Sequence, residues 1–491
     1  MSKSLKILFV SSEIEPFAKT GGLADVSSAL PQMIKEHGHD IRVMMPRYGT
    51  ISDRKFKLHD VIRLKELQLP IGNSIKVANV NSSFISNLKI KVQVYLLANK
   101  ELYGRNGIYI SATTLKEFPD NDERYIFFAR GVLETLKRLG WQPDIIHCND
   151  WQTGLIPAYM KTLYADDPFF IPIKTIFTIH NLHYQGNFPA NSFSKTNLPP
   201  SLLSKLQVNN NSQYSFMKAG LEFADIITTV SPQYAKEICE DKETINGLHE
   251  VISKRKRKLF GILNGIDYNI WNPEIDPIIS KRYNFDTIDS KFDNKLELID
   301  KFNLKGEEPT PIIGIISRLV PEKGIDIILS ALPELMKLKL RIVMLGTGKP
   351  EFTKLFSEAE KKYKGQFSFK AAFDPILAHM IEAGSDFYLM PSKYEPCGLN
   401  QMYSMRYGTI PIVRATGGLI DTVIDSSKSG GTGFTFTKYS SEELVITVER
   451  ALKVCSQPSA WRKLIKNAMQ KDYSWKTSAN KYIALYNKAL L

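Results

Sequence analysis

Two cations stand five residues apart in the segment SRLVPEKG, which runs from Ser317 to Gly324. The segment follows a short apolar stretch and precedes an amphipathic one, so the pattern predicts a loop between a strand and a helix. Arg318 and Lys323 can meet negative charge as it develops, which suits stabilisation of a departing diphosphate. The alternative interpretation is that both cations only cap and solvate the loop.

A second polar segment, PSKYEPCGLNQ at 391–401, lies between a predicted buried strand and a predicted helix. The helix start at Cys397, Gly398 and Leu399 offers backbone N–H donors to a phosphate. Glu395 can accept hydrogen bonds from sugar hydroxyls, although a single glutamate in a loop is usually only solvated. A glycine pair follows the next predicted strand, in the segment TGGL at 416–419.

A comparable loop follows the first predicted strand. Its sequence KTGGL, at 19–23, opens a helix that has Asp25 in its first turn. Gly21 and Gly22 let a ligand approach the backbone, the helix start offers N–H groups to an anion, and Lys19 adds a mobile charge. The spacing matches neither the dinucleotide fingerprint nor the nucleotide-triphosphate loop, so a dehydrogenase or an ATPase is not supported. A glycine pair without a ligand is the alternative.

Polar side chains also follow two later strands of the first half, in HCNDWQT (147–153) and FTIHN (177–181). Trp151 offers an apolar face to a sugar ring, and Asp150 offers a hydrogen-bond acceptor. His180 stands at the end of the next strand. A single histidine there is structural as often as it is catalytic, but the three residues together favour a sugar site.

These loops need a scaffold that brings strand ends together. Apolar stretches without in–out alternation are separated by amphipathic ones in both halves, which predicts two parallel sheets covered by helices. Ligands bind at the carboxyl edges of such sheets. The predicted strands are 5–10, 41–46, 92–97, 144–147, 174–180 and 225–230, then 311–317, 341–345, 367–371, 386–390 and 410–413. The predicted helices are 122–139, 153–163, 324–337, 350–362, 374–383, 398–407 and 441–455, and the charge-rich segment 276–308 is predicted to be a peripheral excursion.

Composition indicates a globular protein of several domains. The chain has 491 residues, 43% of them hydrophobic and 23% charged. No apolar run approaches the ~18 residues of a membrane span, and no signal or transit peptide is recognisable, so a cytoplasmic location is expected. The net charge of +13 favours anionic ligands without selecting one, and the basic run 254–258 is interpreted as solvated surface. The four cysteines lie far apart with no CxxC pair, so no disulfide framework, metal site or cofactor is expected.

These segments occur in one order along nearly the whole chain, from KTGGLADV at 19–26 to Tyr473-Ser474-Trp475, with ILNGID at 262–267 between them. In that order they resemble the bacterial glycogen synthases and plastidial starch synthases that use ADP-glucose. The resemblance implies a GT-B fold, an α/β architecture of two doubly wound Rossmann-like domains facing across a deep cleft. It implies retaining transfer of glucose from ADP-glucose to the non-reducing end of an α-1,4-glucan such as glycogen. It also implies an N-terminal domain over 1–253, a C-terminal domain over 254–470 and a helix over 471–491 that crosses back.

The same resemblance implies roles for individual residues. Arg318 and Lys323 would neutralise the diphosphate, and Glu395 would hold hydroxyls of the donor glucose. His180 would contact that glucose, and Asp150 would lie on the sugar side of the cleft. Tyr103 would stack near the nucleotide. The donor contacts would comprise Lys19, Gly21, Gly22, Asp25, Tyr103, Asn264, Cys397, Gly398, Leu399, Thr416, Gly417 and Gly418.

Two positions depart from the family pattern. Members usually carry histidine where this chain has Gln152, and glutamine where it has Glu322. Both lie beside matched residues, so altered kinetics are expected rather than lost activity. One alternative is a UDP-sugar-dependent GT-B enzyme, against which the KTGGL loop and the PCGL helix start argue. The other alternative is an inactive glucan-binding protein. It would require loss of one of four charged site residues, and all four are present: Lys19, Arg318, Lys323 and Glu395. No nucleic-acid or membrane partner is expected, and the oligomeric state stays open.

Overall fold

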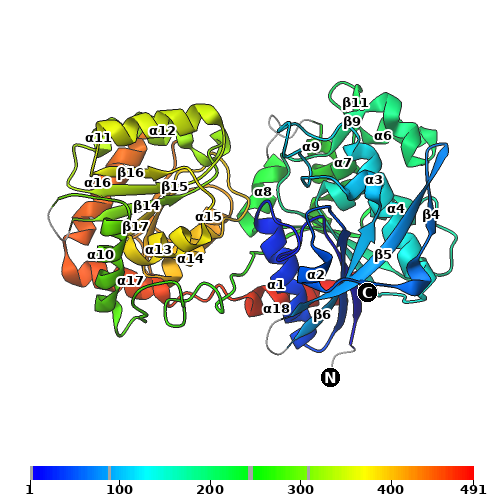
Figure 1. The fold of residues 1–491 in the computed structure, drawn as a ribbon, viewed down its shortest axis with the longest axis horizontal. Coiled ribbons are helices and arrows are strands. Elements are labelled where there is room, and N and C mark those ends of the chain that lie inside the picture. Colours follow the sequence, from blue (N-terminus) through cyan, green and yellow to red (C-terminus); the bar gives the residue numbers. More distant parts are fainter. Residues whose placement is uncertain (1–3, 87–89, 241–246, 307–309) are drawn as a thin grey trace. The chain divides into compact units, whose positions relative to one another are not determined.

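The computed structural model describes residues 4–86, 90–240, 247–306 and 310–491. The chain forms two compact units, one of residues 1–262 together with 475–491 and one of residues 263–474 (Figure 1). The predicted boundary after residue 253 precedes this division, because β13 (Leu259–Gly261) pairs in parallel with β12 (Ile226–Thr229) and so completes the first sheet. Among the described residues, no helix combines the length and apolar character that a membrane crossing requires.

A ten-stranded sheet forms the centre of the first unit. Seven strands are parallel in the order β13-β12-β8-β7-β1-β2-β6, and β5 and β3 continue the sheet in antiparallel fashion. The tenth strand, β4, pairs with β5 outside this order. Every residue of β1 except the first is buried, which explains the absence of in–out alternation in its sequence. The loops after β1, β7 and β8 therefore share one edge of the sheet. The remaining strands are β1 (Lys6–Val10), β2 (Asp40–Pro46), β3 (His59–Asp60), β4 (Leu67–Ile71), β5 (Ser74–Ser86), β6 (Lys91–Ala98), β7 (Ile145–Asn149) and β8 (Lys174–Ile179).

Helices complete the first unit. The amphipathic α1 (Gly22–Glu36) packs against α18 (Trp475–Ala489), so the end of the chain belongs to the unit in which it begins. The largely buried α4 (Asn121–Leu139) ends at Gly140, whose φ of 65° is the left-handed conformation that favours glycine at a helix end. The predicted helix 153–163 is shorter, because a 3₁₀ turn at Trp151–Thr153 leads into α5 (Leu155–Met160). The other helices are α2 (Asp53–Phe56), α3 (Lys100–Tyr103), α6 (Leu203–Leu206), α7 (Phe216–Phe223), α8 (Pro232–Glu240) and α9 (His249–Arg255).

Two β features of the first unit were not predicted. The hairpin of β4 and β5 alternates buried and exposed residues, as expected for strands with one face in water. A small antiparallel sheet joins β9 (Asn187–Pro189), β10 (Gln207–Val208) and β11 (Gln213–Ser215). Strands of two or three residues are too short for a sequence pattern to reveal.

The second unit is built on a six-stranded, wholly parallel sheet in the order β16-β15-β14-β17-β18-β19. All five strands predicted in this half are present, and the short β19 (Phe434–Phe436) adds an edge. The strands are β14 (Ile312–Ile316), β15 (Arg341–Leu345), β16 (Phe367–Lys370), β17 (Phe387–Met390) and β18 (Ile410–Arg414). The helices are α10 (Lys291–Lys301), α11 (Ile325–Leu335), α12 (Pro350–Lys362), α13 (Pro375–Gly384), α14 (Asn400–Arg406), α15 (Gly418–Thr422), α16 (Ser441–Cys455) and α17 (Pro458–Met469).

The charge-rich segment 276–308 is not a peripheral excursion, and that prediction is wrong. Its helix α10 packs against α13, and Leu298 and Phe302 are buried in the core there. The Nζ of Lys291 lies inside the unit, where it donates to the carbonyl oxygens of Glu382 (3.1 Å) and Ala383 (2.7 Å). A lysine that finds such acceptors can be buried, so charge alone does not place a segment at the surface.

Candidate active site

Two loops of the second unit meet at Gly324. This residue follows the 3₁₀ turn Pro321–Lys323 with a φ of 72°, and a Cβ there would lie 2.2 Å from the carbonyl oxygen of Pro391. Only glycine permits both the left-handed backbone and this close approach. The loop after β14 is thereby held against the loop after β17.

This contact brings together Lys323 and Glu395, which are 72 residues apart in sequence. The Nζ of Lys323 lies 2.5 Å from Oε2 of Glu395, and Ser392 Oγ donates to the same oxygen at 3.0 Å. The side chains are 21% and 8% exposed, respectively. The pair is therefore a shielded cation and carboxylate at the carboxyl edge of the sheet, where charge–charge interactions are stronger than in bulk water.

Arg318 lies on the same loop but is more open, with half of its side chain exposed. Its guanidinium lies 3.9 Å from the carboxylate of Glu322, one of the two positions expected from the sequence to depart from the family pattern. An ion pair at this distance, with one partner half exposed, is weak. The departure at Glu322 places a competing negative charge next to that cation.

The segment around Cys397 is tightly packed. The N–H of Gly418 donates to the carbonyl oxygen of Glu395 at 3.0 Å, and a Cβ at Gly418 would lie 2.2 Å from the carbonyl oxygen of Cys397. Burial raises the pKa of the Cys397 thiol to about 12, and the Asn264 backbone N–H beside the sulfur acts in the opposite direction. The thiol is therefore no nucleophile at neutral pH. Thr416 and Gly417 precede α15, which starts at Gly418, and Gly398 and Leu399 precede α14.

Asp150 and His180 lie together at the carboxyl edge of the first sheet. Asp150 follows β7 with a φ of 57° and a ψ of 179°, a conformation that costs a non-glycine residue about 1–3 kcal/mol. Its Oδ1 accepts the backbone N–H of His180 at 2.7 Å. Burial raises the pKa of Asp150 to about 7, while the N–H groups of His180 and Asn181 favour its ionised form. This carboxyl group can thus change charge near neutral pH.

The protonation of His180 follows from its partner. Asn149 donates through Nδ2 to the carbonyl oxygen of Val10, so its Oδ1 is the acceptor that lies 2.9 Å from Nε2 of His180. Nε2 therefore carries the proton, and Nδ1 is left as an acceptor. Burial lowers the pKa of His180 to about 3, so the ring is neutral at pH 7. A neutral imidazole with an open acceptor suits contact with a sugar hydroxyl.

The KTGGL loop differs from the prediction. The N–H groups of Thr20 and Gly21 both donate to the carboxylate of Glu13, so they are not available to a phosphate. Lys19 forms a partly exposed ion pair, with its Nζ 2.6 Å from Oδ1 of Asp25 and both side chains about one-third exposed. Burial raises the pKa of Asp25, and Lys19 acts against that rise. The sequence pattern missed Glu13, whose one signal is that it is an acidic residue three positions after β1.

Two aromatic predictions are wrong. Tyr103 is completely buried, and its hydroxyl donates to the carbonyl oxygen of Arg124, so its ring offers no face to a nucleotide. Trp151 is 9% exposed and packs edge-on against Tyr125, and Gly186 covers its ring. Exposed aromatic surface at a strand end occurs instead at Phe373, which follows β16 and is 80% exposed.

Two Rossmann-like α/β units, with charged loops at the carboxyl edges of their parallel sheets, define a glycosyltransferase of the GT-B fold, as predicted. The family described as starch synthase catalytic domain matches residues 6–254, and that described as glycosyl transferases group 1 matches residues 297–471. The chain therefore belongs to the family of glycogen and starch synthases.

Individual relatives cover the whole chain. A glycogen synthase of Desulforudis audaxviator is 42% identical over 508 aligned residues, with 99% of this chain and 97% of the relative covered. A glycogen synthase of Syntrophotalea carbinolica is 40% identical over 488 residues, with 99% of each covered. The catalytic domain of starch synthase IV from Arabidopsis thaliana, solved with ADP and acarbose, has a TM-score of 0.90 at 30% identity and covers 99% of this chain and 100% of its own.

Proposed function

We propose that this glycosyltransferase moves glucose from ADP-glucose to the non-reducing end of an α-1,4-glucan, with retention of configuration and release of ADP. The observation that carries the proposal is the largely buried Lys323–Glu395 pair, which brings a cation and a carboxylate together. The proposal assigns the cation to a phosphate and the carboxylate to sugar hydroxyls. The release of ADP as the nucleotide product is supported by the ADP bound in the structure of the related starch synthase IV. The bacterial glycogen synthases among the relatives support a glucan acceptor and a cytoplasmic location.

In the proposed reaction the bond between C1 of glucose and the β-phosphate oxygen breaks as Lys323 and Arg318 take up the charge of the departing ADP. The 4-hydroxyl of the glucan attacks C1 from the same face, and its proton passes to the departing phosphate oxygen. One C–O bond is lost and one is formed, and ADP leaves with the proton. The protein contributes mainly charge stabilisation and positioning, so Glu395 is assigned to holding donor hydroxyls and not to nucleophilic attack.

The remaining predicted residues receive supporting roles. His180 accepts a sugar hydroxyl at Nδ1, and Asp150 fixes the backbone of His180 through their hydrogen bond. Asn264 and the glycines at 417 and 418 lie around the Cys397 segment that adjoins Glu395. Phe373 takes the place of Tyr103 as the aromatic ring proposed to stack on the base, because it is exposed at a strand end and Tyr103 is not.

Competition between donors tests the proposal directly. Radiolabel from ADP-glucose is expected to enter glycogen with a kcat/KM at least about 10-fold above that for UDP-glucose, measured under identical conditions. In the same assay, Phe373→Ala is expected to raise the donor KM and leave the glycogen KM unchanged. Preferential use of UDP-glucose would favour the alternative GT-B enzyme, and absence of transfer from both donors would favour an inactive glucan-binding protein.

Asp150 gives the reaction a pH dependence. Protonation removes the negative charge that strengthens the hydrogen bonds from the backbone N–H groups of His180 and Asn181, and the pKa of Asp150 lies at about 7. The kcat/KM for the donor is therefore expected to fall as the pH drops below about 7, and Asp150→Asn is expected to lack this acid limb and to be slower throughout. A pH–rate profile of both proteins checks the expectation. An acid limb that persists unchanged in Asp150→Asn would assign it to another group.

A further inference from the structure

The N–H groups just before α1 bind an anionic side chain of the protein itself, the carboxylate of Glu13. Glu13 is 3% exposed, and its carboxylate accepts hydrogen bonds from the N–H and hydroxyl of Thr20 (the latter at 2.7 Å) and from the N–H of Gly21 at 3.3 Å. The hydroxyl of Tyr109 donates to the same carboxylate at 2.7 Å. Helix N-termini attract negative charge through their N–H groups, and Glu13 satisfies that attraction internally.

Because the Glu13 carboxylate accepts hydrogen bonds from this loop, only some of the loop's groups remain available to a ligand. With the N–H groups of Thr20 and Gly21 turned to Glu13, the next donor is the N–H of Gly22, for which the described part of the chain provides no acceptor. A Cβ added at Gly21 would meet nothing within 4 Å, so packing within the protein does not demand glycine there. The open space, the Gly22 N–H and the partly exposed Lys19 make up the face that the loop offers to a ligand.

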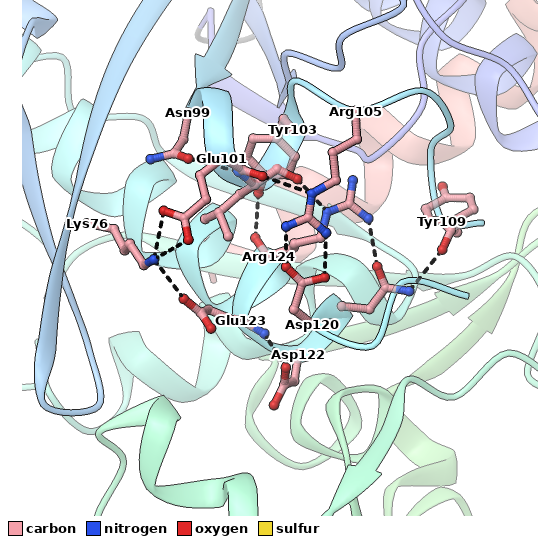
Figure 2. A network of polar contacts seen from close by, with 12 residues as sticks. Lys76, Asn99, Glu101, Tyr103, Arg105, Tyr109, Asp120, Asp122, Glu123 and Arg124 are labelled. Atoms are coloured by element: carbon pink, nitrogen blue, oxygen red, sulfur yellow. Dashed lines mark hydrogen bonds and ion pairs between the residues drawn. The ribbon is translucent and has the colours of Figure 1, made fainter. Parts of the chain in front are cut away.

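A buried polar network holds Glu13 from the other side. Arg124 is completely enclosed and donates to the carbonyl oxygen of Ile108 at 2.8 Å and to Oδ1 of Asn121 at 2.7 Å. Asn121 in turn donates to the carbonyl oxygen of Tyr109 at 3.1 Å. Figure 2 shows Arg124 and Tyr109 in this region, together with the ion pair of Arg105 and Asp120. The segment that carries Tyr109 is thus anchored on α4.

We propose that Glu13 is a positioning residue for the donor: it sets the 19–22 loop so that Lys19 and the Gly22 N–H face the diphosphate, and Tyr109 acts through it. The inference rests on the proposed function, because the ligand of the loop is taken to be the sugar nucleotide. Glu13 does not touch the reacting atoms. Its effect is on the donor, and the glucan is bound by other groups.

Glu13→Gln separates positioning from other roles. The variant keeps the shape of the side chain but replaces one acceptor oxygen by an NH2 group that cannot accept from Thr20, Gly21 or Tyr109. The kcat/KM for ADP-glucose is expected to fall about 10- to 100-fold, since hydrogen bonds to a charged group are involved, while the KM for glycogen stays unchanged. The matched control is Glu15→Gln, which removes the same charge from a partly exposed residue of the same loop and is expected to behave as the wild type.

A double-mutant cycle tests the route through Tyr109. Tyr109→Phe removes one hydroxyl and is expected to lower the kcat/KM for the donor about 3- to 10-fold. Because that hydroxyl acts through the Glu13 carboxylate, adding the substitution to Glu13→Gln is expected to cause little further loss. If Glu13→Gln melts well below the wild type, the test depends on Tyr109→Phe alone: the expected loss in the kcat/KM for the donor supports the inference, and its absence refutes it.

Several outcomes would overturn the inference. They are equal activity of Glu13→Gln and Glu15→Gln, a defect confined to the KM for glycogen, or independent effects of the two substitutions in the cycle. Failure of the proposed function looks different, because the wild type itself would then not transfer glucose from ADP-glucose. The wild-type assay is therefore read first, and the variants are compared with it.

Discussion

Replacing Lys323 by alanine is expected to lower kcat about 100- to 1,000-fold while changing the KM for the donor much less. The ammonium group lies 2.5 Å from Glu395 in a largely buried pair, where it can meet the charge that appears on the diphosphate as the sugar bond breaks. An interaction that strengthens in the transition state affects kcat more than ground-state binding. Steady-state kinetics with ADP-glucose and glycogen measure both constants.

The control for this experiment is Lys393→Ala. Lys393 is an exposed lysine in the same stretch of chain as Glu395, and its loss removes an equal charge without touching the pair. It is expected to leave kcat within about twofold of the wild type. If Lys323→Ala kept its kcat and only bound the donor more weakly, the role of this lysine in stabilising the leaving group would be refuted.

Replacing Lys291 by methionine is expected to destabilise the second unit by about 2–4 kcal/mol. The substitution keeps the aliphatic stem but leaves the carbonyl oxygens of Glu382 and Ala383, and the hydroxyl of Thr409, without the donor they share. Burial lowers the pKa of Lys291 to about 7, so part of the lysine is a neutral amine at neutral pH, and that amine still donates. Hydrogen exchange of the amides of β17 and β18 reports the loss within this unit.

Lys301→Met provides the comparison, because Lys301 is exposed at the other end of the same helix. Its substitution is expected to change stability by less than about 0.5 kcal/mol. Equal effects of the two variants would mean that the buried hydrogen bonds of Lys291 contribute nothing measurable. An effect of Lys291→Met on exchange in the first unit alone would likewise contradict the assignment.

The sequence predicts the scaffold well because the strands that build it are long and buried on both faces. All eleven predicted strands exist, with ends shifted by a residue or two. What escaped prediction was short or exposed on one face, such as β19 and the β4–β5 hairpin. The burial of α10 escaped because Lys291 finds its acceptors on α13 and at Thr409, far away in sequence.

The sequence suggests individual candidate site residues but not the contacts between them. The motifs point to Lys323 and Glu395 separately, and the glycine at 324 that lets their loops touch becomes meaningful only in three dimensions. Tyr103 and Tyr109 are six residues apart in one segment, and no pattern in it tells which of them turns into the core. Glu13 was missed because an acidic residue in a loop gives no sign that it will fill the start of a helix. The roles of these residues remain to be tested by the variants above.

The packing of α18 has a consequence for the order in which the molecule is made. His147 and Tyr486 form a buried hydrogen bond of 2.8 Å inside the first unit, although 339 residues separate them. The second unit is encoded entirely between these two positions. A ribosome therefore synthesises all of the second unit before it adds the tyrosine that completes the first, so the half of the enzyme that is begun first is finished last.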